Sequence, residues 1–191
     1  PSVPVNNFRE LLDYARKNPG KLSYGTSGVG TSHHMASELV KLRTGVDMVH
    51  VPYKSGAQSY GDLISGQIPV LYGVLAQLGP GAKAGKLRMI ALQNDRRYPP
   101  AGVAPIKDTV PDYVSPPWWT SYYGPAGMSE PLVRRLNAEI LKAINVPEVK
   151  AKLDEAGFLV IGSSPEELAS TMKADIERMA VVVKAAGIQP E

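Results

Sequence analysis

A stretch rich in glycine and hydroxyl side chains, residues 22–35, carries the clearest chemical signal in this sequence. Its glycines, which allow positive φ angles and close approach of a ligand to the backbone, are Gly25, Gly28 and Gly30. Ser27 and Thr31 can cap N–H groups that a following helix leaves unpaired. We therefore predict a small-anion site made of N–H donors and hydroxyls at the positive end of a helix dipole. A tight strand-to-helix turn that binds nothing is the alternative.

The chain has three histidines, His33, His34 and His50. Neighbouring side chains on a helix point about 100° apart, so His33 and His34 do not suit one metal ion, and we expect no metal site. Glu38 lies one helical turn after His34 and is expected to be a solvated partner. His34 itself is interpreted as a packing or capping residue below the loop. Lys54 is either a ligand contact or a solvated surface lysine.

The loop does not match the common cofactor and nucleophile motifs. No Gly-Lys-Ser/Thr sequence follows it, which excludes a Walker phosphate loop. His33 occupies the place of the third glycine of a dinucleotide fingerprint, and Val29 that of the second glycine of a nucleophile elbow. We expect no bound cofactor and no catalytic residue.

The first part of the chain alternates between strand and helix patterns. Helices are predicted over 7–17, 31–43, 56–64 and 74–78, the last with an extension near 82–84, and strands over 22–24, 48–51, 68–72 and 87–92. This alternation is typical of a parallel sheet covered on both faces.

The last third contains too few strands for its helices. After a proline-rich segment, 94–117, strands are predicted only over 119–123 and 158–161. Helices predicted over 130–144, 147–156 and 165–186 carry apolar stripes that need a partner surface. This part therefore resembles half of a lobe whose other half is absent, and we expect it to expose apolar helix faces.

Composition narrows the function classes. The 191 residues suit one domain or two small lobes, and the net charge of +3 comes from scattered lysines and arginines, which disfavours nucleic-acid binding. Cysteine is absent, so disulfides and thiolate metal sites are excluded. No apolar run is long enough to span a bilayer. The start, without methionine, is expected to be a processed or trimmed end.

Six blocks in this order resemble the extracytoplasmic solute receptors of tripartite tricarboxylate transporters, the Bug proteins: 19–35, 46–54, 66–68, 84–88, 124–127 and 136–140. The resemblance implies an α/β fold like that of periplasmic binding proteins. The chain would hold one complete Rossmann-like lobe, residues 1–118, and the C-terminal part of a second lobe, 119–191. The N-terminal half of that second lobe would be absent.

The resemblance also implies which residues contact the ligand. The loop that holds a carboxylate maps onto Ser27, Gly28, Val29, Gly30 and Thr31, with His34 matching the family histidine. Gly73 and Gln93 occupy pocket positions where many relatives have Asp and Thr or Ser, so the ligand cannot be named. Trp119, at the crossing between the lobes, completes the predicted ligand-binding set.

We therefore predict a periplasmic, solute-binding, non-enzymatic receptor. It would capture a small carboxylate by lobe closure and deliver it to membrane transporter subunits. The alternatives are a ligand-sensing module and an enzyme on the same fold using Ser27 or His34. With half of the clamp missing, the chain should bind carboxylates weakly and associate with its missing part or with itself.

Overall fold

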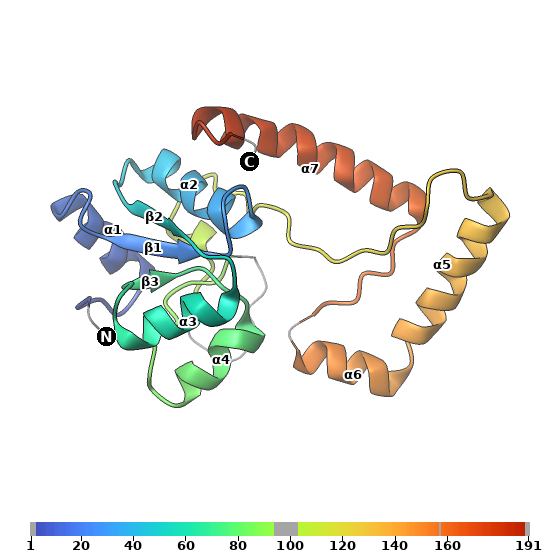
Figure 1. Ribbon diagram of the computed structural model, residues 1–191, viewed down its shortest axis with the longest axis horizontal. Coiled ribbons are helices and arrows are strands. Elements are labelled where there is room, and N and C mark those ends of the chain that lie inside the picture. Colours follow the sequence, from blue (N-terminus) through green and yellow to red (C-terminus); the bar gives the residue numbers. More distant parts are fainter. Residues whose placement is uncertain (1–2, 94–102, 157, 190–191) are drawn as a thin grey trace. The chain divides into compact units, whose positions relative to one another are not determined.

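The computed structural model describes residues 3–93, 103–156 and 158–189, and its helices and strands are labelled in Figure 1. The elements are, in chain order, α1 (Phe8–Lys17), β1 (Ser23–Thr26), α2 (Ser32–Thr44), β2 (Val49–Pro52), α3 (Gly56–Ser65), β3 (Val70–Leu71), α4 (Leu75–Lys83), the short 3-10 helix η1 (Ile106–Asp108), α5 (Glu130–Ile144), α6 (Pro147–Glu155) and α7 (Pro165–Ala185). No helix in these ranges is both long enough and apolar enough to cross a membrane.

The three strands form a parallel sheet in the order β2-β1-β3. Tyr24 of β1 lies opposite His50 of β2 and Val70 of β3. Since parallel strands end at the same edge of a sheet, the loops after β1, β2 and β3 start from one edge. This is where open α/β sheets place their ligands.

Capping signals set the helix boundaries in this region. The side chain of Asn7 accepts a hydrogen bond from the Glu10 N–H at the start of α1. Thr31 does the same for His34 at the start of α2, and Gly45 ends that helix in the left-handed conformation, with φ 67°. These local signals explain why the predicted helices and the observed ones nearly coincide.

The hydrophobic core lies on the sheet face that Tyr24 points toward. It includes Leu11 and Leu12 of α1 and Val40 of α2, all at most 3% exposed. The next residue along β1, Gly25, faces the opposite side, since strand side chains alternate. A Cβ atom there would lie 2.6 Å from Cδ1 of Ile68, so α3 and its neighbours cover that face closely.

The chain divides into two compact units. One comprises Pro1–Pro117 with Met179–Glu191, and the other comprises Trp118–Arg178. The division lies one residue before the predicted boundary at 118/119. Residues from 179 onward, predicted to belong with the second part, instead pack with the first, because Met179 and Val182 enter its core. The assignment of the two parts to lobes of a receptor stays a prediction.

The expected strands over 87–92, 119–123 and 158–161 are not observed as strands among the described residues. Of these, only Leu92 makes a bridge, to Pro105. A strand needs a hydrogen-bonded neighbour, and the described backbone offers the other two segments none. The strand expected over 68–72 is reduced to Val70–Leu71.

The second unit has no buried core among its described residues. No described residue from Trp118 to Arg178 is buried. Leu132 and Leu136 on α5 are each 45% exposed, and Ile176 on α7 is 66% exposed. The expected exposure of apolar helix faces is therefore observed, and these helices expose surface that folded proteins normally cover.

Candidate functional site

The predicted anion loop connects the end of β1 to the start of α2 (Figure 1). Gly28 and Gly30 have φ angles of 125° and 71°, which side-chain-bearing residues rarely adopt. Gly28 also lies near the carbonyl oxygen of Tyr53, so the loop runs beside the end of β2. These two glycines allow the chain to turn within five residues and begin a helix.

Two threonines hold the shape of this loop. The Thr26 side chain is fully buried, and its Oγ1 lies 3.3 Å from the N atom and 3.2 Å from the O atom of Gly28. The Thr31 hydroxyl donates to the same Gly28 oxygen at 2.8 Å while it caps α2. The backbone of Gly28 is therefore fixed from both ends of the loop.

Two stacked histidine rings lie beneath the loop. The Gly30 N–H donates to Nδ1 of His34 at 3.1 Å, and Nε2 of His50 lies 2.7 Å from the Thr26 hydroxyl. The ring centroids of His34 and His50 are 4.0 Å apart and their planes differ by 11°. His34 comes from α2 and His50 from β2, so the contact joins a helix to a strand of the sheet.

Both rings are uncharged near neutral pH. Burial lowers the pKa of His34; the negative charge of Glu38 raises it and the positive charge of Lys41 lowers it, each less than burial does. Burial, and then the proximity of His34, lower the pKa of His50 from 6.5 to about 4. Since Nδ1 of neutral His34 accepts the Gly30 hydrogen bond, its ring proton resides on Nε2.

A buried carboxylate completes the group. Glu38 is 9% exposed and accepts hydrogen bonds from the Tyr24 hydroxyl at 2.5 Å and from Nζ of Lys41 at 2.8 Å. Its Oε1 also lies 3.9 Å from Nε2 of His34. Glu38 is thus not the solvated partner that the sequence predicted, because three side chains surround it. Burial and the bond to Glu38 raise the pKa of Tyr24.

The loop presents donors that are not already in use. The N–H groups of Val29 and Thr31 donate to no acceptor among the described residues, and both residues are only half-buried. Ser27 is exposed, and its Oγ lies 3.4 Å from Nδ1 of His33. This arrangement suits an anion that accepts backbone hydrogen bonds at the start of α2.

The remaining predicted site residues lie in different places. Gly73 follows β3 at the same sheet edge as Ser27, and a Cβ there would lie 3.1 Å from Cδ1 of Leu78. Gln93 has a buried Nε2 atom with no partner among the described residues, and the segment from 94 to 102 lies outside them. Trp119 belongs to the other unit, where its Nε1 donates to Asp175 at 2.9 Å.

His50, Thr26 and Tyr24 were missed by sequence reasoning. A signal for His50 existed, since it alternates with the buried Met48 along a strand and so shares its face. The partners of that face depend on strand register, which the sequence does not reveal. The described residues contain no group of three or more His, Asp or Glu side chains that could hold a metal ion.

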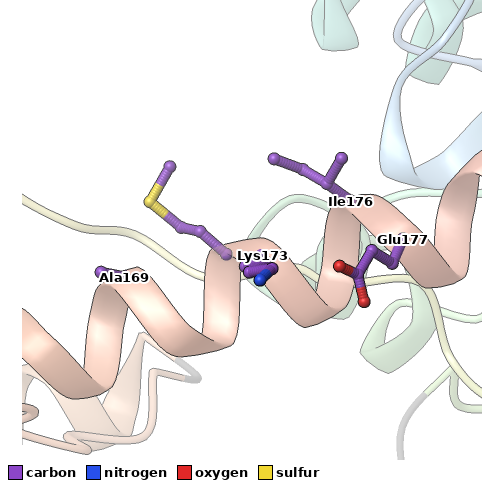
Figure 2. Close-up of a pocket in the computed structure, with 5 residues that line it drawn as sticks. Ala169, Lys173, Ile176 and Glu177 are labelled. Atoms are coloured by element: carbon purple, nitrogen blue, oxygen red, sulfur yellow. The ribbon is translucent and has the colours of Figure 1, made fainter.

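A separate shallow depression lies on the second unit. Its lining residues, spaced along one face of α7, are Ala169, Met172, Lys173, Ile176 and Glu177 (Figure 2). It contains no residue predicted to bind ligand. Its position on a single helix marks it as part of the exposed apolar stripe of α7 and not as an enclosed binding cavity.

Comparison with known proteins identifies relatives over almost the whole chain. A family model described as "Tripartite tricarboxylate transporter family receptor" matches residues 1–188. A "UPF0065 protein in tcbD-tcbE intergenic region" of Pseudomonas sp. strain P51 is 34% identical over 185 residues, which are 92% of this chain and 54% of that protein. The chain therefore spans about half the length of this relative.

Two solved structures resemble the chain in sequence and fold. One, described as "R. palustris Rpa4515 with adipate", has a TM-score of 0.83 at 32% identity and is matched over 100% of this chain and 64% of its own. Another, "Structure of a periplasmic transporter", has a TM-score of 0.86 at 34% identity, with 97% and 62% matched. The predicted α/β fold of a periplasmic binding protein is confirmed, and the family consists of substrate-binding receptors and not of enzymes. The chain belongs to the tripartite tricarboxylate transporter receptor family.

Proposed function

We propose that this chain is part of a periplasmic receptor that binds a small carboxylate and presents it to the membrane subunits of a tripartite tricarboxylate-type transporter. The observation that carries the proposal is the loop before α2, where the N–H groups of Val29 and Thr31 meet no acceptor in the described part of the chain and the Ser27 side chain is exposed. Backbone donors at a helix N-terminus favour a carboxylate without requiring a charged side chain.

Two further features support an anionic ligand. Lys54, which is exposed, follows β2 at the same sheet edge as the loop and adds a positive charge there. The solved relative with adipate indicates the class of ligand, a flexible carboxylate with two charged ends. In this proposal one carboxylate lies on the loop, while Gly73 and Gln93 of the same unit contact the remainder of the ligand.

Calorimetric titration of the chain with straight-chain dicarboxylates, adipate among them, tests this function. Ser27→Asp places a negative charge beside the unused N–H groups and should weaken binding by about tenfold or more. Gln58→Glu adds the same charge on the exposed surface of α3 and is the matched control, with an unchanged affinity expected. Absence of dicarboxylate binding, or equal affinity of the Ser27→Asp variant and the parent, would refute the proposal.

A further inference from the structure

Two hydrogen bonds, called ties below, join the anion loop to the stacked rings of His34 and His50. The first tie joins the Thr26 hydroxyl to Nε2 of His50, and the second joins the Gly30 N–H to Nδ1 of His34. Between them, the Thr26 hydroxyl contacts both backbone polar atoms of Gly28. The direction of the N–H groups of Val29 and Thr31 therefore depends on the two rings beneath the loop.

The second tie requires one tautomer of His34. Nδ1 can accept from Gly30 only while the proton resides on Nε2. Oε1 of Glu38 lies 3.9 Å from that Nε2, beyond hydrogen-bond distance, and its negative charge favours a proton there. Lys41 pairs with Glu38 at 2.8 Å and offsets its charge, so Glu38 orients the ring without converting it to the cation.

The first tie depends on where the His50 ring is held. The Tyr24 ring stacks with it at a centroid distance of 5.1 Å, and the His34 ring stacks with it at 4.0 Å. Tyr24 lies opposite His50 in the register of β1 and β2, and His34 comes from α2, so the ring position depends on both the sheet register and the packing of α2. Its Nε2 is thereby held 2.7 Å from Thr26.

We propose that His50 and Glu38 are positioning residues for carboxylate binding: His50 acts through Thr26 on the backbone of Gly28, and Glu38 acts through His34 on the N–H of Gly30. The inference rests on the proposed function of the loop and extends it to two side chains beneath the ligand. Neither residue contacts the ligand, and both determine how the loop presents its donors.

This arrangement predicts that affinity for an anion falls on acidification. Charge attraction alone would predict the opposite, since the protein gains positive charge. A proton on Nδ1 of His34 turns an acceptor into a donor that faces the Gly30 N–H, so the tie breaks. Anion binding then weakens on acidification, although the protein gains positive charge. The titratable and charged groups around the ring pair are Glu38 and Lys41 on α2, Tyr24 on β1 and Tyr72 after β3.

Three substitutions separate positioning from folding, with adipate as the probe. His50→Phe keeps an aromatic ring in the stack and removes the bond to Thr26, so its affinity should fall by about tenfold. His50→Gln keeps a side-chain amide that can donate to or accept from the Thr26 hydroxyl, and should stay within about threefold of the parent. Tyr53→Phe removes a buried hydroxyl bonded to Asp62 on the opposite sheet face, and should lose stability but not affinity.

Nuclear magnetic resonance of the ligand-free chain provides the second readout. The ring nitrogen shifts of His34 should show a bare Nδ1 and a protonated Nε2, and Glu38→Gln should increase the other tautomer. The amide of Gly28 should shift in His50→Phe, and that of Gly30 in Glu38→Gln.

The two hypotheses fail in distinguishable ways. If the parent chain does not bind adipate, the proposed function is wrong, whereas the ring tautomer and amide shifts still decide the positioning of the loop. If the parent binds and His50→Phe binds equally well, His50 is not a positioning residue. A proton found on Nδ1 of His34 in the parent overturns the role of Glu38.

Discussion

Acidification should destabilise this chain through His50, whose ring stacks with those of Tyr24 and His34. The pKa of His50 is lowered from 6.5 to about 4 by burial and then by His34. In the unfolded chain the same ring takes up a proton as the pH falls through about 6.5. The contribution of His50 to the free energy of unfolding is therefore complete above pH 6.5 and is lost as the pH falls toward about 4.

The size of the effect follows from the two pKa values. The gap between 6.5 and about 4 corresponds to roughly 3 kcal/mol of free energy of unfolding. Because the ring is partly exposed, solvent screening reduces the expected loss to about 1–2 kcal/mol. Burial lowers the pKa of His34 too, so that ring changes the stability in the same direction.

Urea unfolding of the parent and of His50→Gln, at about pH 8 and about pH 5, measures this loss above the range in which most carboxylates titrate. Because pH 5 lies above the folded-state pKa of about 4, only part of the loss is sampled, and the parent should lose about 1 kcal/mol more than the variant, which lacks the titrating ring. Equal losses in the two proteins would refute the reasoning. So would a parent that becomes more stable on acidification.

Three further substitutions test the packing and the exposed surface. Gly25→Ala brings a Cβ within 2.6 Å of Cδ1 of Ile68 and should lower the free energy of unfolding in urea by about 1–3 kcal/mol. An unchanged urea midpoint would contradict close packing on the sheet face that Gly25 points toward. Leu12→Ala, at a side chain only 2% exposed, should cost about 2–5 kcal/mol in the same assay. Ile176→Ser, at a side chain 66% exposed, should change the free energy of unfolding by less than about 0.5 kcal/mol. It should also reduce self-association in sedimentation velocity. A parent that is monomeric at all concentrations would contradict the expected self-association.

Local signals made the helices of the first unit predictable. Asn7, Thr31 and Ser55 each accept a hydrogen bond from an N–H in the first turn of the helix that follows. Gly45 and Gly66 each end a helix with a positive φ angle. These interactions are made within a few residues of the chain, so the sequence pattern is sufficient to locate them.

Strands depend on distant partners, and there the predictions were less accurate. The segments over 119–123 and 158–161 have the aromatic and branched residues typical of strands, but no described neighbour pairs with them. By contrast, β1 lies between two partners and is observed where a strand was predicted. Composition indicates which segments favour an extended backbone, whereas pairing decides which of them become strands.

The candidate site likewise has a local part that the sequence predicted and a part made by distant contacts that it did not. The turn itself was predictable, because Gly28 and Gly30 are required where φ is positive and Thr31 is required as a cap. The ring pair beneath it was not, since His34 and His50 are brought together by packing α2 against β2. The direction of the loop's donors therefore depends on contacts that only the folded structure reveals.

Glu38 shows why a residue that sequence rules place in solvent can be buried at such a site. Burying a carboxylate costs free energy unless it is paired, and Tyr24 and Lys41 together supply that pairing. Well-packed apolar residues at the same positions would avoid this cost and would leave the folded chain equally stable or more so. They would not favour the Nε2–H tautomer of His34, on which the Gly30 N–H depends. The buried charge is therefore better explained by the orientation of the anion loop than by stability.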